Sequence, residues 1–493
     1  MPAVSESKPE SGHRRRLRPV RTASGEVRAD TEPVGKRRWW WIGALWLLLL
    51  VLVAAGAGQW RFGWVESLPH STLTRTPIAV PTQPGAAPVA LASQAAPIDE
   101  AAVAAAVRPY LGLKGTLGPH VDLLVTGLTG SPAFRSGIGP IAPASTLKLL
   151  TATAALQTLG PQARFTTTVR LTGASTITLV GGGDPYLATK ASPKADYPKR
   201  ATLADLAART AAELKSRHLT HVRLDYDASM FSGPGLSPSW EPGYFPSGVI
   251  APISALWTNE GHLPNGAVSA NPSQTAAQVF AGLLRAKGIA VAGSPAAVMA
   301  AHSAPEIARV TSAPLVDVLS ETLTMSDNFA AEVIARHVAI ATGHPATFDG
   351  AVAAVRQTLT SIGVPTTGLV LHDGSGLSRH DRLEPATLAA VLRLAVTKPR
   401  LSGLLTDLPV AGFDGSLTYR FEKTSATALG LVRAKTGTLT GVHSMAGFAI
   451  DASGNPLIFI ALADQVPVMN TLDARNVLDR IGAALTTCRC SVS

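Results

Sequence analysis

Apolar residues recur along this 493-residue chain at two spacings, and each spacing predicts one kind of element. A spacing of three to four residues indicates a helix with one buried face, whereas alternation indicates a strand. The predicted helices cover residues 144–159, 202–218, 274–287, 347–363, 384–396 and 469–486, together with two helices over 314–342 that are broken near Ser326. The predicted strands cover residues 121–129, 165–172, 176–181, 221–225, 430–439, 443–450 and 457–464, with a hairpin partner over 132–137.

The order of these elements predicts the fold class. Strands lie near both ends of the folded part of the chain, and a long helical stretch lies between them. A sheet and its helices must bury their apolar faces against one another. We therefore expect a mixed α/β (α+β) protein, in which helices flank an antiparallel sheet next to an all-helical part.

Residues 39–58 form an apolar run without a charged side chain. About 20 such residues suffice to cross a bilayer as a helix. Tryptophans flank the run, and Lys-Arg-Arg at 36–38 precedes it, which is typical of a cytoplasmic flank. We expect a single-pass protein of the cell membrane, with a cytoplasmic N-terminus, a transmembrane helix at 39–58 and an extracytoplasmic body. A secretory signal cleaved after residues 55–57 stays open as the alternative.

Positive charge is concentrated at the start of the chain. The net charge is +10, and residues 1–38 hold ten Lys and Arg against five Asp and Glu. A basic tail can bind nucleic acid. Directly before an apolar run, however, it is more simply explained as a topology signal, so we expect no nucleic-acid partner. Residues 59–97 are rich in proline and alanine, which predicts a flexible linker to a body that begins near residue 98.

Cysteines and metal ligands are sparse. The two cysteines, Cys488 and Cys490, are separated by one residue, a spacing that strains a disulfide. We interpret them as terminal thiols without a catalytic role. No cluster of His, Cys, Asp or Glu has the spacing of metal ligands, so we expect no metal and no cofactor.

A serine and a lysine three residues apart, Ser145 and Lys148, stand at the start of the first predicted helix, after Pro143. In a first helical turn the two side chains share a face and can touch. A serine hydroxyl needs a base that accepts its proton, and a desolvated lysine near a second cation can serve as that base. The spacing alone is unspecific, because Ser5 and Lys8 match it as well.

Ser326-Asp327-Asn328 stands at the predicted break between two helices. From such a loop, the hydroxyl of Ser326 can relay a proton to a leaving group. The amide of Asn328 can bind a substrate carbonyl and hold Lys148. The alternative is that Ser326 is a helix N-cap. Ser269-Ala270-Asn271 shows that Ser-x-Asn alone is also unspecific.

Lys435-Thr436-Gly437-Thr438 lies on a predicted strand. Thr436 and Thr438 share one face of that strand and Lys435 points to the other. Gly437 permits the close approach of another backbone. An edge of this kind can pair with a peptide, offer a cation and hydroxyls to its carboxylate, and donate a backbone N–H to an oxyanion.

The three motifs together are specific. In this order, and on a helix, an inter-helix loop and a strand, they are the set found in class A β-lactamases and penicillin-binding proteins. The chain resembles one family more narrowly, the D-alanyl-D-alanine carboxypeptidase/endopeptidases, also called penicillin-binding protein 4-like or class C low-molecular-mass proteins. The long interval between Ser145 and Ser326 resembles that family's insertion. Further segments that resemble it are Gly-Gly-Gly-Asp-Pro at 181–185, Pro-Ile-Ser-Ala-Leu at 252–256 and Asp-Gly-Ser-Gly-Leu-Ser-Arg at 373–379.

The resemblance implies the reaction. Ser145 would attack the carbonyl of a D-Ala-D-Ala bond in a peptidoglycan stem peptide, and Lys148 would be the base. Ser326 and Asn328 would complete the centre. The backbone N–H groups of Ser145 and Thr438 would form the oxyanion hole. β-Lactam antibiotics would acylate the same serine.

The resemblance also implies the substrate contacts. Lys435, Thr436 and Thr438 would hold the terminal carboxylate, and Asp327 and Gly437 complete the second and third motifs. Arg379 either lines a pocket for the stem-peptide side chain or ties its own loop down, and these alternatives stay open. Glu241 falls near the family's acidic position in that pocket.

The resemblance divides the chain as well. We expect a basic tail, a transmembrane helix, a linker, a transpeptidase-like catalytic domain in two segments and an inserted domain, at residues 1–38, 39–58, 59–97, 98–163 with 310–493, and 164–309.

Two other functions compete with a carboxypeptidase, with or without endopeptidase action. A serine β-lactamase needs a deacylating carboxylate after the second motif, and only Asp381 and Glu384 lie nearby, without a matching context. A non-catalytic wall-binding protein on the same fold is the other, and the intact motifs argue against it.

Overall fold

Two five-stranded sheets organise the folded part of the chain. The computed structural model describes residues 96–130, 133–192, 197–421 and 426–492. All of them belong to one compact unit.

The first sheet is antiparallel throughout and brings distant parts of the chain together. Its strand order is β2-β1-β10-β9-β8. The central strand, β10, pairs with β1, so that Leu124 lies opposite Ile460. The bounds of these strands are Ala133–Ser136, Val121–Gly127, Pro456–Ala463, Val442–Ile450 and Val432–Leu439. The predicted antiparallel sheet and the mixed α/β class are confirmed.

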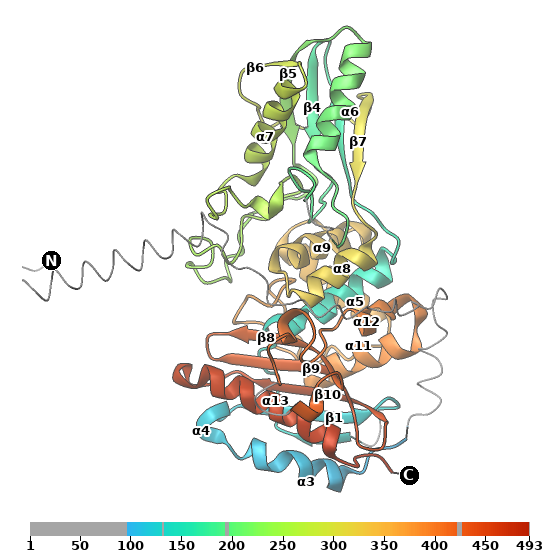
Figure 1. Cartoon of the computed structure of the whole chain (residues 1–493), viewed down its shortest axis with the longest axis vertical. Helices are drawn as coiled ribbons and strands as arrows, with labels where there is room; N and C mark the ends of the chain where they lie inside the picture. The colour runs from blue at the N-terminus through green and yellow to red at the C-terminus, as the bar shows by residue number, and fades with distance from the viewer. Residues whose placement is uncertain (1–95, 131–132, 193–196, 422–425, 493) are drawn as a thin grey trace, which may run out of the picture. The chain divides into compact units, whose positions relative to one another are not determined.

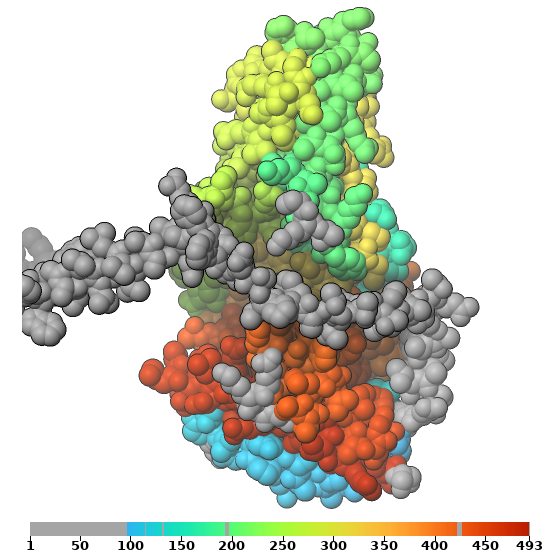
Figure 2. Space-filling view, viewed as in Figure 1, coloured from blue at the N-terminus to red at the C-terminus, as the bar shows by residue number. Residues whose placement is uncertain are grey.

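Helices cover both faces of this sheet (Figure 1). On one face, α3 (Glu100–Leu111) and α13 (Thr471–Thr487) bury an apolar layer that includes Val103, Phe459 and Ile481. In the space-filling view, α3 and α4 (Lys114–Leu117), in blue, and the C-terminal part of the chain form the outer surface over this layer (Figure 2). Helix α3 was not predicted, although Asp99 caps its N-terminus.

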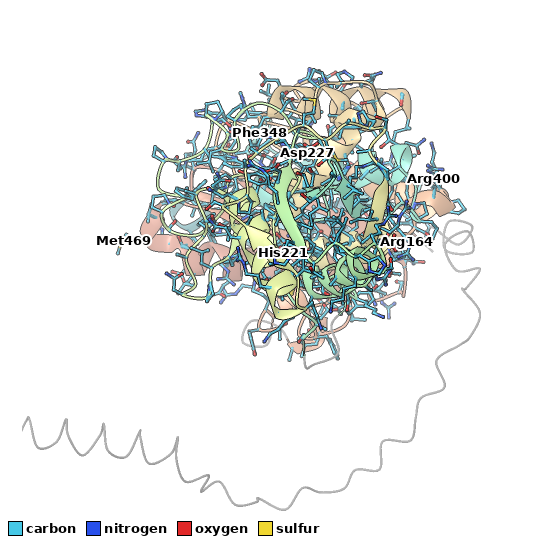
Figure 3. All side chains as sticks on the ribbon, turned by 90° about the horizontal axis from the view of Figure 1, so that it is seen from above. Arg164, His221, Asp227, Phe348, Arg400 and Met469 are labelled. Atoms are coloured by element: carbon cyan, nitrogen blue, oxygen red, sulfur yellow. A yellow bond between two sulfur atoms is a disulfide. The ribbon has the colours of Figure 1, made fainter. Side chains whose placement is uncertain are left out.

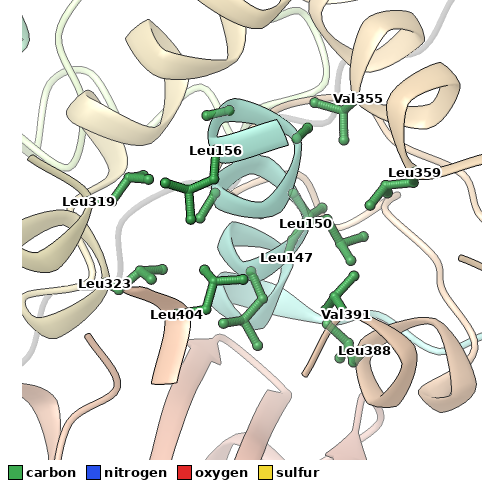
Figure 4. Packing of buried hydrophobic residues seen from close by; sticks show 14 of the residues in the cluster. Leu147, Leu150, Leu156, Leu319, Leu323, Val355, Leu359, Leu388, Val391 and Leu404 are labelled. Carbon is green, nitrogen blue, oxygen red and sulfur yellow. The ribbon is translucent and has the colours of Figure 1, made fainter. Parts of the chain in front are cut away.

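The other face packs on the helical part that the sequence predicted. A 3₁₀ turn, η1 (Ala144–Leu147), leads into α5 (Lys148–Thr158), whose first nine residues are buried. The helices around it are α8 (Leu315–Thr324), α9 (Asn328–Ala341), α10 (Phe348–Ser361), α11 (Pro385–Thr397) and α12 (Gly403–Thr406). Figure 4 shows leucines of η1 and α5 surrounded by Leu319, Leu323, Val355, Leu359, Leu388, Val391 and Leu404. The helix that begins at Lys148 is therefore held from all sides.

The second sheet is mixed, with strand order β6-β5-β4-β3-β7. Parallel pairing of β4 with β5 and of β5 with β6 makes two crossover connections, through α6 (Leu203–Ser216) and α7 (Pro272–Ala286). Thr202 and Asn271 cap these helices with their side chains. Figure 3 labels both ends of β5, His221 and Asp227. The strands β3 to β7 are Thr166–Leu171, Thr176–Val180, His221–Asp227, Ala290–Ala292 and Glu306–Thr311.

Two strands of this sheet, β6 and β7, were not predicted from the sequence. The remaining regular segments are short 3₁₀ turns: η2 (Asn259–Gly261), η3 (Pro399–Leu401), η4 (Gly415–Leu417), η5 (Ala426–Ala428) and η6 (Val468–Asn470).

Two expectations need correction. Within the part of the chain that the structure describes, no helix is both long and apolar enough to cross a membrane. The expected span at 39–58 lies outside the described residues. Because no anchor is shown, the expectation of a single-pass membrane protein with a cytoplasmic N-terminus is wrong. The two cysteines are not free thiols, because Cys488 and Cys490 form a disulfide.

Candidate active site

Ser145 lies in η1, directly before the buried helix α5. The residue before it, Ala144, has φ 46°, in the left-handed region that non-glycine residues rarely adopt. Such a conformation persists only where its surroundings impose it, and it is concentrated at functional sites. The turn is held by Thr146, whose hydroxyl donates to the Pro143 carbonyl at 2.7 Å.

Lys148 is buried, with 1% of its surface exposed, and its amine meets three oxygens. The Nζ atom lies 2.9 Å from Ser145 Oγ, 2.7 Å from Asn328 Oδ1 and 2.8 Å from the backbone oxygen of Ser375. Burial lowers the pKa of Lys148 to about 8, although the negative charges of Asp373, Asp327 and Glu332 act in the opposite direction. A neutral amine is therefore accessible near neutral pH.

The same three contacts orient that neutral amine. The amide oxygen of Asn328 and the carbonyl of Ser375 can only accept hydrogen bonds, whereas a hydroxyl can also donate. A neutral amine has two N–H groups and one lone pair. If the two N–H groups go to the two fixed acceptors, the lone pair faces the Ser145 hydroxyl, which is the geometry a base needs.

The second motif lies where the sequence predicted, between α8 and α9. Ser326 has φ 61°, and Asn328 is the first residue of α9. The N-cap of this helix is Asp327 rather than Ser326, because Asp327 Oδ1 accepts from the backbone N–H of Ala330 at 3.1 Å. The cap fixes the start of α9 and thereby places the neighbouring hydroxyl and amide.

The third motif joins the second through Lys435. Its Nζ donates to Ser326 Oγ and to the backbone oxygen of Thr436, each at 2.8 Å. Lys435 has no exposed surface. Burial lowers its pKa well below the ordinary lysine value, and the nearby charge of Lys148 lowers it further. Each serine of the site thus has a lysine partner: Lys148 contacts Ser145, and Lys435 contacts Ser326.

Gly437 lets the edge strand β8 approach the nucleophile closely. A Cβ atom at this position would lie 2.2 Å from Ser444 Oγ and 2.8 Å from the backbone nitrogen of Ser145. Ser444, in turn, donates to the carbonyl of Pro143 at 2.6 Å. No side chain fits here, so the prediction that Gly437 permits the close approach of another backbone is confirmed. The strands β8 and β9 both contact the backbone around Ser145.

A groove of about 450 Å³ runs over these residues. Hydroxyl and amide groups line one part of it and apolar side chains line the rest. The lining residues are Ser145, Tyr244, Val249, Ser326, Asn328, Leu377, Thr436, Thr438, Leu439 and Thr440. Two threonines of the third motif therefore face the same space as Ser145, as their shared strand face predicted.

Five predicted substrate contacts do not line the groove: Lys435, Gly437, Asp327, Arg379 and Glu241. Asp327 caps α9, as described above. Arg379 donates to the Thr440 carbonyl, and its Nε lies 3.7 Å from Glu241 Oε1. Arg379 and Glu241 thus tie two loops together beside the groove, which fits the loop-holding alternative.

The two carboxylates considered for a β-lactamase have other partners. Glu384 pairs with Arg135 at 2.6 Å, and Asp381 accepts the backbone N–H of His372 at 2.7 Å. Neither lines the groove. Among the described residues, no group of three or more His, Cys, Asp or Glu side chains could hold a metal ion.

Two acidic residues near Lys148, Glu332 and Asp373, were not predicted from the sequence. Glu332 and Asp373 are buried with 1% of their surface exposed, and both lie near the amine. One signal could have found Glu332: it is the one acidic residue of the largely apolar helix α9, one turn after Asn328. Asp373 begins the Asp-Gly-Ser-Gly-Leu-Ser-Arg segment, but its role depends on contacts across the fold.

An antiparallel sheet flanked by helices, with this serine–lysine pair, a Ser-Asp-Asn loop and a Lys-Thr-Gly edge strand meeting at one groove, defines the penicillin-recognising serine enzymes. The family model of the D-Ala-D-Ala carboxypeptidase 3 (S13) family matches residues 133–271 and 262–487. The chain belongs to this family.

Relatives and solved structures agree with that assignment. A carboxypeptidase of Mycobacterium tuberculosis is 37% identical over 437 residues, covering 86% of this chain and 92% of the relative. Carboxypeptidase DacB of Mycolicibacterium smegmatis is 35% identical over 466 residues, covering 91% and 97%. The crystal structure of penicillin-binding protein 4 (dacB) from Haemophilus influenzae has the same fold, with TM-score 0.63 and 22% identity over 79% of this chain and 98% of that one.

Proposed function

We propose that this protein is a serine-type D-alanyl-D-alanine carboxypeptidase that trims peptidoglycan stem peptides through an acyl-enzyme on Ser145. The observation that carries the proposal is the environment of Lys148. Its amine is buried, lies 2.9 Å from Ser145 Oγ, and has two pure acceptors for its N–H groups. Membership of the D-Ala-D-Ala carboxypeptidase 3 (S13) family supports the substrate class.

In the acylation step, neutral Lys148 accepts the Ser145 proton while Oγ bonds to the carbonyl carbon of the penultimate D-alanine. The negative charge that develops on the carbonyl oxygen is received by the backbone N–H groups of Ser145 and Thr438. The close approach of β8 at Gly437 supports this pairing, since it brings the strand next to the Ser145 nitrogen. The hydroxyls of Thr436 and Thr438 receive the terminal carboxylate in the groove.

The C–N bond then breaks, and the departing D-alanine amine needs a proton. Ser326 lies in the groove and accepts from Lys435, so its own hydroxyl is free to donate, and it relays to the amine the proton that Lys148 took from Ser145. Lys148 is then neutral again. Water attacks the ester carbonyl and gives up a proton to Lys148, which passes it to the departing Ser145 Oγ as the shortened peptide is released. A β-lactam follows the same first step, but its leaving group stays attached to the acyl group.

We further propose that residues 98–163 and 310–493 form the catalytic domain and that 164–309 is inserted into it. The separate apolar core beneath the second sheet supports this division. The last strand of that sheet, β7, extends two residues past 309.

Release of D-alanine from a synthetic stem pentapeptide ending in D-Ala-D-Ala tests the proposal. The full chain is expected to release one equivalent of D-alanine, and S145A none. S269A is the matched control, because it removes a serine of the decoy Ser-x-Asn segment, whose hydroxyl bonds Thr275 and Asn271. Release by S145A at the wild-type rate, or no release by the wild type, would refute the proposal. A cross-linked dimer as second substrate reports endopeptidase action.

A further inference from the structure

The carbonyl of Ser375 belongs to a turn, residues 373–378, that packs against the nucleophile segment. Gly376 has φ +81°, and a Cβ there would lie 2.0 Å from the carbonyl oxygen of Ala144. Thr151 of α5 donates to the Gly374 carbonyl at 2.6 Å. The turn therefore touches the chain on both sides of Lys148, at Ala144 of η1 and at Thr151 of α5, and its position decides where the Ser375 oxygen lies.

Two buried carboxylates fix the backbone of this turn. Glu332 accepts from the backbone N–H groups of Gly374, at 3.0 Å, and Ser375, at 2.8 Å. Asp373 accepts from those of Gly376 and Ser378, each at 2.7 Å. Hydrogen bonds to a charged acceptor are stronger than neutral ones. Burial, together with the nearby charge of Asp373, raises the pKa of Glu332 to about 8.

One further donor reaches Asp373 from a distant part of the chain. The indole Nε1 of Trp240, between β5 and α7, donates to Asp373 Oδ2 at 2.7 Å. The ring is buried and packs edge-on against Phe348, with centroids 5.1 Å apart. Trp240 lies within 164–309, so a single hydrogen bond connects the proposed insertion to the turn that meets Lys148.

We propose that Trp240 and Asp373 are positioning residues, through which the inserted region fixes the Ser375 carbonyl and so orients the lone pair of Lys148 toward Ser145. The inference rests on the proposed function, because it assigns Lys148 as the base. Without the Ser375 acceptor in place, the neutral amine has one fixed partner and its lone pair is free to turn away.

The test compares two matched tryptophan variants of the full chain. W240F removes the N–H donor and keeps an aromatic ring against Phe348. W257F makes the same change in the apolar cluster that holds Trp240 and Phe348, where the Trp257 indole donates to the carbonyls of Asp184 and Pro185. The measured quantity is the second-order rate constant of acylation by benzylpenicillin, followed by intact-protein mass spectrometry. We expect a loss of about tenfold in W240F, by misplacement of the base, and less than twofold in W257F.

D373N adds a readout that a merely structural role would not move. The Asp373 carboxylate favours protonated Lys148, so its removal lowers the pKa of Lys148 and shifts the pH dependence of acylation to lower pH. If D373N does not fold, the tryptophan pair decides alone. Equal rates for W240F and W257F overturn the positioning role and leave the wild-type adduct, and thus the proposed function, standing. Absence of an adduct on the wild type overturns both.

Discussion

The protonation state of Lys148 decides the rate at which Ser145 is acylated. Its pKa of about 8 means that it carries a proton below that pH and cannot accept one from Ser145. The acylation rate by benzylpenicillin is therefore expected to rise with pH, with a midpoint near 8, and to level off above it. Stopped-flow or quenched mass measurements between pH 6 and 10 give this profile. A flat profile across that range would mean that Lys148 is not the base.

Residue identity alone could predict this centre only in part. Ser145, Ser326, Asn328 and Lys435 follow from three short motifs, and the structure brings all of them to within hydrogen-bond distance of one another or of Lys148. The Ser375 carbonyl that accepts from the Lys148 amine, and the burial of that amine, could not be predicted in this way. Neither a backbone contact nor burial is encoded in a local pattern of residue types.

At the scale of elements, the site depends on how closely the edge strand β8 approaches η1. G437A is expected to abolish acylation, because its Cβ would collide with Ser444 and with the Ser145 backbone. G282A is the matched control: Gly282 lies inside α7 with open space around its Cβ position, and alanine there should be neutral or stabilise by roughly 0.5–1 kcal/mol. Penicillin acylation and thermal unfolding of both variants check this. Full acylation of G437A would contradict the described packing.

Among the elements, helices with a long apolar periodicity were predicted from the sequence, whereas strands that depend on distant partners were not. The helices α8 and α9 and their break were predicted, because each has a long apolar periodicity and the break carries polar residues. The strands β6 and β7 were missed. β6 has three residues, too few for an alternation to register, and both strands depend on partners far away in the chain. The alanine-rich α3 offers little contrast between its faces and contains Pro109.

At the scale of the whole molecule, Arg336 joins α9 to the segment expected to be inserted. Its buried guanidinium donates to the carbonyls of Ser232, Pro234 and Ala346. R336M removes this donor from the carbonyls of Ser232 and Pro234, whereas Ala346 still accepts from the backbone N–H of Ser232 at 3.1 Å. The free energy of unfolding should fall by about 3 kcal/mol or more. R285M, which removes one bond to the Val291 carbonyl, should cost about 1 kcal/mol. Denaturant titration of both variants measures the difference, and equal small losses would show that Arg336 does not hold the two parts together.

If Ser145 is the nucleophile of a penicillin-binding carboxypeptidase, it must carry the acyl group after reaction with a β-lactam. The full chain is incubated with benzylpenicillin, and its intact mass and peptide map are recorded next to those of S145A and of S5A, which disrupts the decoy Ser-x-x-Lys. We expect a gain of one penicillin on Ser145 in the wild type and in S5A, and no gain in S145A. An adduct that persists in S145A, or a wild type that stays unmodified, would contradict it.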